Sequence, residues 1–257
     1  MVKILIDPGH GGHDSGAGGA RSYEKNNVLK VALRMKTLLQ QHGHTVNLTR
    51  ETDVYLTLSQ RAAAANKWGA DIFVSLHDNS ATNKTATGFE TFIFDKTSNA
   101  KTIKLQGAIH NALIKEIGLR DRGMKRANFA VLRETNMPAC LVEYAFISNN
   151  NDESLLITEV DKLARLTAKG INDYFGIKTV VATPNSSKED DELRFSSPAL
   201  KAETELTLGS KARRKIIVNA AVKAGAHESW QKKLEDGQIT DVDLLGLAAK
   251  YIIDTNK

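Results

Sequence analysis

Short apolar runs alternate with longer stretches of helical periodicity along the first 177 residues. Six runs have the character of buried strands, at residues 3–6, 45–49, 70–76, 88–94, 130–132 and 139–143. Longer stretches carry apolar side chains at helix spacing, at residues 24–39, 58–68, 100–117 and 153–174. Strands that alternate with helices of this length predict an α/β sheet with helices on both faces. The basic stretch 119–126 is predicted to be a loop.

The pattern changes after residue 177. Residues 178–198 hold two of the four prolines and the acidic run 189–192, a composition typical of a linker. Three short helices are predicted beyond it, at residues 210–226, between Gly225 and Gly237, and at residues 242–253. The expected parts of the chain are a catalytic domain (1–177), a linker (178–198) and a C-terminal helical domain (199–257). A domain of about 60 residues folds only marginally alone, so its self-association is a further expectation.

Side chains that can bind a metal or carry a proton follow three of the apolar runs. His10 follows the first run after an Asp-Pro-Gly turn, His77 follows the third, and Glu143 ends the last. The glycines after His10 let a ligand approach the backbone closely. Three strands that end in such groups predict one site at the carboxyl edge of the sheet.

Two imidazoles and a carboxylate are a usual ligand set for catalytic zinc, with a further position open for water. Glu24 is the candidate third ligand, because it closes the glycine-rich loop 11–23 and starts a helix. Glu143 would then be the general base, and its apolar neighbours favour burial and a raised pKa. Plainer interpretations remain open: His10 as a hydrogen-bonded loop residue, Glu24 as a partner of the helix's positive end, and Glu143 as a surface carboxylate.

Composition restricts the partners. The chain has a net charge of +5, and the 11 basic and 11 acidic residues of 190–257 balance, so the excess lies in residues 1–189. A mildly basic region suits a polyanion such as an anionic cell wall, and no nucleic-acid-reading motif accompanies it. No apolar run approaches a membrane span, and we expect no secretory signal peptide before the first strand. We therefore expect neither nucleic acid nor a membrane as partner. Cys140, the single cysteine, is expected to be a buried thiol.

Several motifs occur in an order that points to one family. They are IDPGHGG (6–12), Glu24-Lys25, LTR (48–50), Arg61 with Ala65-Asn66, ADIFVSLHDN (70–79), Gly88–Thr91, VLR (131–133) and MPACLVEYAFISN (137–149). From about residue 2 to 176, the chain resembles the zinc-dependent N-acetylmuramoyl-L-alanine amidases of the amidase-3 type. The resemblance implies a mixed sheet, here of about six strands, flanked by helices on both faces.

The resemblance also implies a chemistry. His10, Glu24 and His77 would bind Zn²⁺, and Glu143 would be catalytic. The substrate would be peptidoglycan, cleaved at the amide between the lactyl group of N-acetylmuramic acid and the L-alanine of the stem peptide. Asp78 departs from the family, which often has a small residue there, and it is expected to add a negative charge near the metal. Only residues 78–87 join His77 to Gly88, so the plugging helix of some members is not expected.

Four residues are candidates for substrate binding. Asn79 follows the second histidine motif, and His13 lies in the loop of His10. Arg120 and Arg122 belong to a basic cluster before residues 130–132. That cluster either meets the carboxylates of the stem peptide or is a solvated face.

The C-terminal region resembles the cell-wall-binding domains of Bacillus phage and prophage endolysins. The resemblance rests on SPALKA (197–202), residues 211–226 and HESWQKKLEDGQITDVDLL (227–245). It implies binding to a secondary wall polymer, and an endolysin made in the bacterial cytoplasm and released by a holin. The alternatives are a sporulation or autolytic amidase, a non-catalytic wall-binding protein on the same scaffold, and a zinc peptidase or deacetylase.

Overall fold

The computed structural model describes residues 2–177, 211–223, 227–237, 239 and 243–244. The chain divides into two compact units, Met1–Val181 and Ala182–Lys257, which are described separately. The predicted linker 178–198 lies outside the described residues. No described helix is both long and apolar enough to cross a membrane.

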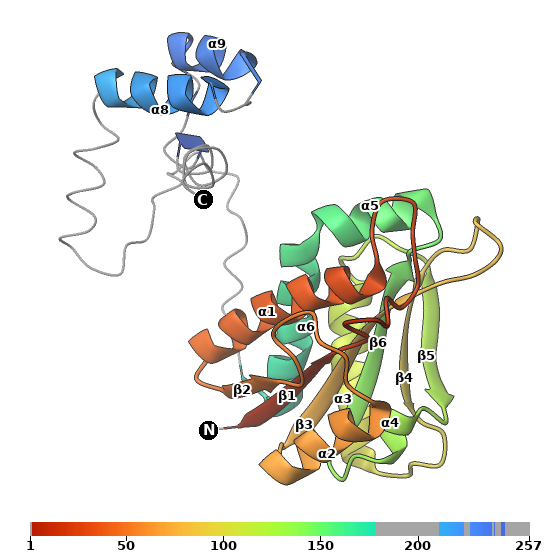
Figure 1. Cartoon of the computed structure of the whole chain (residues 1–257). Coiled ribbons are helices and arrows are strands. Elements are labelled where there is room, and N and C mark those ends of the chain that lie inside the picture. The colour runs from red at the N-terminus through yellow and green to blue at the C-terminus, as the bar shows by residue number, and fades with distance from the viewer. Residues whose placement is uncertain (1, 178–210, 224–226, 238, 240–242, 245–257) are drawn as a thin grey trace. The chain divides into compact units, whose positions relative to one another are not determined.

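The first unit is built on one six-stranded mixed sheet, as predicted (Figure 1). Its strands are β1 (Lys3–Pro8), β2 (Thr45–Leu48), β3 (Ile72–Asn79), β4 (Phe89–Phe94), β5 (Asp121–Ala127) and β6 (Ala139–Phe146). They lie in the order β2-β1-β3-β6-β4-β5. The first four in this order are parallel, β4 is antiparallel to β6, and β5 is parallel to β4. The carboxyl ends of β1, β3 and β6 therefore meet at one edge.

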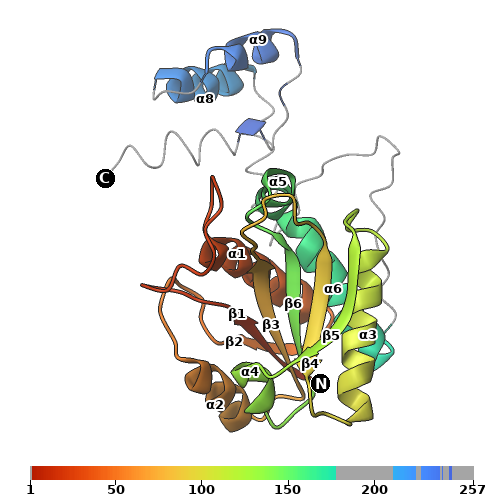
Figure 2. The ribbon, with the colours of Figure 1, turned by 90° about the vertical axis from the view of Figure 1, so that its right-hand side faces the viewer.

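Helices cover the two faces of the sheet unequally (Figure 2). They are α1 (Glu24–Gln41), α2 (Leu58–Trp68), α3 (Ala100–Ile114), α4 (Ala130–Arg133), α5 (Asn150–Thr158) and α6 (Val160–Phe175). The long helices α1, α3 and α6 lie on one face, and the shorter α2 and α4 lie on the other. Helix α5 follows the end of β6.

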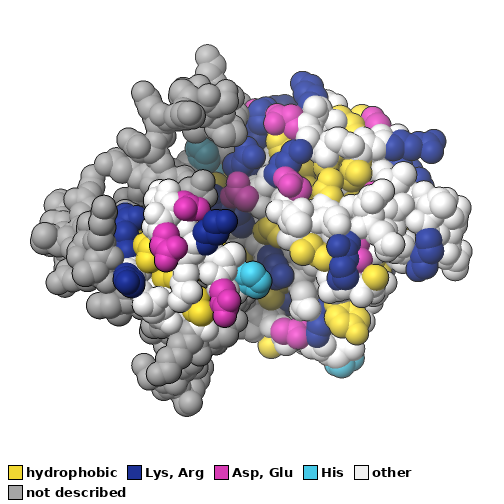
Figure 3. Space-filling model, turned by 90° about the horizontal axis from the view of Figure 1, so that it is seen from above, with side chains coloured by type: hydrophobic (Ala, Val, Ile, Leu, Met, Phe, Trp, Pro, Cys, Tyr) yellow, Lys and Arg dark blue, Asp and Glu magenta, His cyan; other side chains and the backbone are white. Residues whose placement is uncertain are grey.

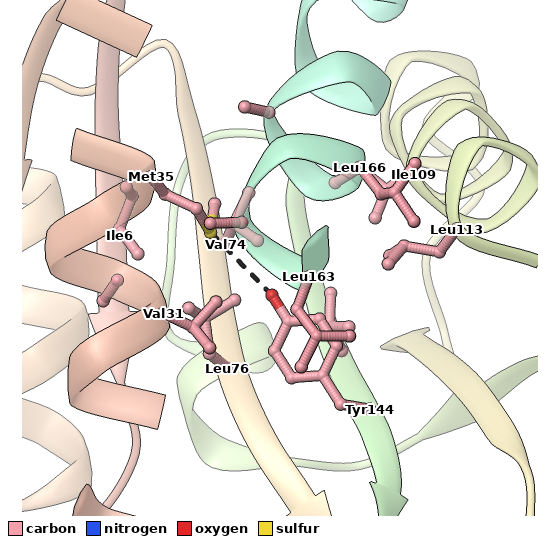
Figure 4. Close-up of a cluster of buried hydrophobic side chains, with 14 of the residues drawn as sticks. Ile6, Val31, Met35, Val74, Leu76, Ile109, Leu113, Tyr144, Leu163 and Leu166 are labelled. Atoms are coloured by element: carbon pink, nitrogen blue, oxygen red, sulfur yellow. Dashed lines mark hydrogen bonds between the residues drawn. The ribbon is translucent and has the colours of Figure 1, made fainter. Parts of the chain in front are cut away.

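Alternation along the central strands supplies both faces of the core. On β1, Ile4 and Ile6 pack in the larger cluster with α1, α3 and α6, whereas Leu5 packs with the smaller cluster under α2 and α4. Successive strand residues point to opposite faces, so one strand contributes to both clusters. Figure 4 shows the larger cluster, where the buried hydroxyl of Tyr144 contacts the sulfur of Met35 at 3.8 Å.

Two local predictions were wrong. The basic stretch 119–126, predicted as a loop, contains most of β5, and residues 130–132, predicted as a strand, belong to α4. Strand β5 lies at the edge of the sheet, where exposed basic side chains are tolerated because only one side is paired. The run at 130–132 is too short for periodicity to separate a strand from a helical turn. One predicted strand is a helical turn and one predicted loop is a strand, so the predicted number of about six strands is still correct.

The second unit contains α8 (Lys211–Lys223) and α9 (Ser229–Glu235), near the first two helices predicted for this region. Four buried side chains form its described core: Val218, Ala221, Ile239 and Leu244. The third predicted helix, 242–253, lies outside the described residues apart from positions 243 and 244.

Candidate functional site

Strand register brings three acidic or imidazole side chains into one row. His77 on β3 is paired with Glu143 on β6, and Glu143 is paired with Glu90 on β4. Paired residues on neighbouring strands point to the same face of a sheet. Successive residues of a strand point to opposite faces, so Phe73 shares a face with His77, and Leu141 shares a face with Glu143. Both Phe73 and Leu141 belong to the hydrophobic cluster under α2 and α4. The row therefore lies on the more thinly covered face, at the edge where β3 and β6 end.

The loop after β1 brings His10 beside His77. The two ring centroids are 5.0 Å apart. His10 has a φ of 59°, a left-handed conformation that non-glycine residues adopt rarely. A Cβ on Gly9 would lie 2.3 Å from Cε1 of His77. The glycine is thus required for the two imidazoles to lie so close.

Two buried arginines hold this loop. Arg61 donates from Nη2 to the carbonyl of His10 at 2.7 Å, and Arg50 donates from Nη2 to the carbonyl of Gly9 at 2.7 Å. The guanidinium of Arg61 also pairs with the buried carboxylate of Asp7 at 2.9 Å. Both arginines matched family motifs in the sequence without an assigned role. Their contacts now account for the unusual backbone at His10.

Glu24, at the first turn of α1, connects the two imidazoles. Its Oε1 lies 3.1 Å from Nε2 of His10 and 2.8 Å from Nδ1 of His77. The backbone amide of Ala17 donates to its Oε2 at 2.8 Å. Burial disfavours the charged carboxylate, but the hydrogen bonds of His10 and His77 outweigh it and lower the pKa of Glu24. Glu24 is therefore a buried, ionised carboxylate.

Asp14 was not predicted from the sequence. Its Oδ2 lies 2.9 Å from Nδ1 of His10, the nitrogen on the far side of the ring from Glu24. Burial lowers the pKa of His10, but the contacts with Glu24 and Asp14 outweigh it and the pKa is raised. A carboxylate in this position fixes the ring and its tautomer. The only sequence signal was an acidic residue four positions after the histidine, which is not distinctive.

His10, Glu24 and His77 form a group that could hold a metal ion. Each offers one ligand atom, and these atoms lie within 4.8 Å of one another. Two nitrogens and one carboxylate oxygen suit zinc by their chemistry. Two other histidines of the first unit contact buried polar partners instead: His44 contacts Asn172 at 2.7 Å and His110 contacts Thr91 at 3.0 Å.

Glu143 faces this group from the neighbouring strand. Its Oε2 is buried and has no hydrogen-bond partner among the described residues. Burial raises the pKa of Glu143 well above its ordinary value, and the negative charges of Glu24, Asp78 and Glu90 raise it further. A carboxyl group in these surroundings readily holds a proton.

Glu90 is a second acidic residue that the sequence reasoning did not single out. Arg122 donates from Nε to its Oε2 at 2.9 Å, Lys125 pairs with the same oxygen, and Asn79 donates to its Oε1 at 2.6 Å. Burial favours the neutral acid, but Lys125 and Arg122 outweigh it and lower the pKa of Glu90. Two residues predicted to bind substrate, Asn79 and Arg122, thus contact this carboxylate. Glu143 is paired with Glu90 across the neighbouring strands.

The other expectations for the site have different outcomes. His13 is exposed and its ring lies 4.1 Å from that of Tyr55, whereas Arg120 is exposed just before β5.

Asp78 is buried and accepts a hydrogen bond from Asn27 at 3.0 Å. Burial, and then the charge of Glu24, raise the pKa of Asp78 well above its ordinary value. The negative charge that Asp78 was expected to add near the metal stays a prediction. Residues 80–88, between β3 and β4, contain no helix.

Comparisons with known proteins agree with this fold. The family model of N-acetylmuramoyl-L-alanine amidases named Amidase_3 matches residues 4–173. The sporulation-specific N-acetylmuramoyl-L-alanine amidase of Bacillus subtilis (strain 168) is 44% identical over 182 residues, covering 69% of this chain and 70% of the relative. The endolysin of Bacillus phage SPP1 is 39% identical over 198 residues, covering 74% and 72%.

A solved structure extends the comparison to three dimensions. The catalytic domain of CwlV, an N-acetylmuramoyl-L-alanine amidase from Bacillus (Paenibacillus) polymyxa var. colistinus, superposes with a TM-score of 0.66 and 37% identity. The match covers 69% of this chain and all of that one. This chain therefore belongs to the N-acetylmuramoyl-L-alanine amidases of the Amidase_3 family.

Proposed function

We propose that this amidase is zinc-dependent, with His10, Glu24 and His77 as the zinc ligands and Glu143 as the catalytic acid and base. The bond cleaved is the amide between N-acetylmuramic acid and the L-alanine of the peptidoglycan stem peptide. One observation carries the proposal: Oε1 of Glu24 lies within 3.1 Å of a nitrogen of each imidazole, while Glu143 is in register with His77. Four groups of the required chemistry thus meet at one sheet edge.

The side chains have separate tasks in this proposal. Zinc, when bound, polarises the amide carbonyl and activates water for attack. Glu143 takes a proton from the attacking water and returns it to the leaving amine of L-alanine, which suits its raised pKa. Asp14 orients the ring of His10, and Arg61 fixes the backbone of His10 through the carbonyl group.

End-group analysis of digested Gram-positive peptidoglycan tests the activity. We expect new L-alanine amino termini without new reducing sugars. A zinc chelator should prevent the formation of these termini, and added zinc should restore it. New reducing sugars would indicate a glycosidase instead. Wall binding without new termini would favour the non-catalytic wall-binding protein, an alternative that the intact set of four residues does not support.

Substitution of Glu143 tests its role separately. Glu143→Ala should lower hydrolysis about 10²–10⁴-fold, the usual contribution of a positioned acid or base, while zinc and wall binding persist. Glu143→Gln, which keeps the shape of the side chain, should show the same loss. Full turnover in either variant would exclude Glu143 as the proton carrier.

Within the family, we propose that the chain acts as an endolysin that reaches the cell wall after release by a holin. The 39% identity to a phage endolysin supports this, as does the sequence resemblance of residues 197–245 to the wall-binding domains of endolysins. The 44% identity to a sporulation-specific amidase supports a second candidate, a sporulation autolysin. Expression in vegetative Bacillus cells distinguishes them: an endolysin lyses the cells only when a holin is co-expressed. An autolysin restricted to spore-type peptidoglycan leaves them intact with or without the holin.

The C-terminal region is proposed to bind a secondary wall polymer and to self-associate. Removal of residues 199–257 should weaken sedimentation with intact walls while leaving hydrolysis of soluble muropeptides nearly unchanged. Equal losses in both assays would instead make the region a structural part of the enzyme. Light scattering of the full chain and the truncated chain tests the self-association.

A further inference from the structure

A cleft of about 330 Å³ opens beside His10 and His77. Tyr55, Leu56 and Leu58, from the segment between β2 and the first turn of α2, are its apolar lining side chains together with Val131 of α4. Small-molecule sites typically begin at about this volume. Tyr55 exposes 42% of its surface and Leu58 exposes 57%. Large apolar side chains exposed next to reactive groups mark a binding surface rather than a core.

The apolar wall is fixed relative to the imidazoles. The ring of Tyr55 lies 4.1 Å from that of His13, in the loop that carries His10. Asp53 accepts hydrogen bonds from the backbone of Gly12 at 2.8 Å and from Lys25 at 2.7 Å. These contacts join the two loops, so the wall is preformed rather than assembled around a ligand.

The opposite side of the site is polar and cationic. Arg122 and Lys125 both contact Glu90, so two positive charges face one negative charge. The side chain of Lys125 remains 37% exposed. Figure 3 shows basic side chains beside hydrophobic ones on the face of the first unit seen from above. A surplus of positive charge at a partly desolvated position favours a carboxylate ligand.

The two halves of the peptidoglycan substrate differ as the two sides of the site do, because one half has apolar surfaces and the other is anionic. The N-acetylmuramoyl half has a pyranose ring, whose C–H faces pack against aromatic rings, together with lactyl and acetyl methyl groups. The stem peptide carries free carboxylates. The strand order places Glu143 on β6 between His77 on β3 and Glu90 on β4. A group that returns a proton to the leaving amine must lie on the peptide side of the scissile bond.

We propose that the substrate crosses the sheet edge in one direction. The N-acetylmuramoyl group occupies the cleft of Tyr55, Leu56 and Leu58, and the stem peptide passes Glu143 toward Arg122 and Lys125. This inference rests on the proposed function and specifies which residues of the same site recognise each half of the substrate.

Two soluble substrates test the sugar side: a muramoyl peptide, and the same peptide carrying only the lactyl group. Tyr55→Ala should lower kcat/KM about tenfold for the first and less than about twofold for the second, because only the first places a ring on Tyr55. Ile103→Ala, an exposed apolar residue of α3, is the matched control and should change neither. Failure of the wild type to cleave the lactyl peptide, with cleavage of the muramoyl peptide, would also support a sugar subsite.

A second pair of substrates tests the peptide side: muramoyl peptides with a free isoglutamate carboxylate or with its amide. Lys125→Gln should reduce the preference of the wild type for the carboxylate about fivefold or more, whereas Tyr55→Ala should leave that preference unchanged. A purely structural effect of Lys125 on Glu90 would lower both rates equally and leave the ratio intact.

The outcomes separate the inference from the proposed function. If the wild type cleaves none of the substrates, the proposed function is wrong, and the proposed subsites are wrong as well. If the wild type is active but Tyr55→Ala slows the muramoyl and lactyl peptides equally, the sugar does not lie on Tyr55. If Lys125→Gln alters sugar dependence and Tyr55→Ala alters the carboxylate preference, the substrate crosses the site in the reverse direction.

Discussion

The two faces of the central sheet are built from the same strands but differ in what covers them. Three long helices, α1, α3 and α6, bury one face in a continuous apolar cluster. The other face is covered by α2 and the single turn of α4, over a much smaller cluster. His77, Glu143 and Glu90 lie on this second face. Unequal coverage leaves room for polar side chains at the sheet edge while the first face supplies the main apolar core.

The faces also differ in how their buried polar groups are satisfied. On the thinly covered face, Asp7 accepts hydrogen bonds from Arg61, Thr49 and Ser75 at 2.6–2.9 Å. On the other face, the buried polar contacts are separate pairs: Tyr144 and Thr167 form a hydroxyl pair at 2.9 Å, and His44 contacts Asn172 at 2.7 Å. Substitutions in the Asp7 network, which reaches the carbonyl of His10 through Arg61, should therefore change both stability and metal binding. Substitutions in the apolar cluster of the other face, away from Glu24, should change stability alone. Four substitutions, from the largest expected effect to the smallest, test this difference.

Arg61→Gln should have the largest effect, because it removes one partner of a buried ion pair. Such a loss costs about 3–5 kcal/mol of unfolding free energy. It also removes the hydrogen bond to the carbonyl of His10, so zinc affinity of the folded protein should fall as well. Chemical denaturation and zinc titration against a competing chelator measure the two effects. A stability loss with unchanged zinc affinity would contradict the proposed link between Arg61 and His10.

Leu163→Ala affects the helical face instead. The fully buried side chain lies in the larger cluster, and its truncation should cost about 2–5 kcal/mol through lost burial and a cavity. Zinc affinity, measured under conditions where the variant remains folded, should match the wild type. A lowered affinity in the folded variant would mean that the two faces are coupled.

Asp14→Asn should weaken zinc binding more than it affects folding. Loss of a carboxylate that orients a ligand histidine typically costs about 10–100-fold in metal affinity. The side chain is 41% exposed, so the metal-free protein should unfold at nearly the wild-type denaturant concentration. Unchanged zinc affinity would show that Asp14 does not orient His10 for metal binding.

Lys169→Ala should have the smallest effect. Lys169 pairs with Asp173 at 2.6 Å along the exposed side of α6, and such pairs contribute only about 0.3–0.5 kcal/mol. Denaturation should show a change of this size, and zinc titration none. A larger stability loss would mean that the outer surface of α6 contributes more than a solvated ion pair.

Long, strongly patterned segments were predicted well from the sequence. The apolar run of β3 and the helix spacing of α1 appear near their predicted positions, because each pattern covers enough residues to identify its period. The segment that forms strand β5 was predicted as a loop, and the segment that forms helix α4 was predicted as a strand. Their sequences are short, and pairing with β4 and packing near the sheet decided their conformations.

The candidate site shows the same division. His10, His77 and Glu143 were predicted together because each follows an apolar run, a signal that lies within a few neighbouring residues. Glu90 lacked such a signal, since it lies inside a strand and its importance comes from pairing with a residue more than fifty positions away. Asp14 lay in the recognised loop, but nothing in its sequence context specified contact with His10.

The sequence by itself determined most of the elements, the four residues that carry the proposed chemistry and the family. These depend on local periodicity, turn residues and motif order, all of which can be read along the chain. The tertiary structure decided the strand order, the contacts of Arg61 and Asp14 with His10, and the apolar cleft beside the imidazoles. Those features arise when segments distant in sequence pack together, and the free energy of that packing is not a property of any single segment.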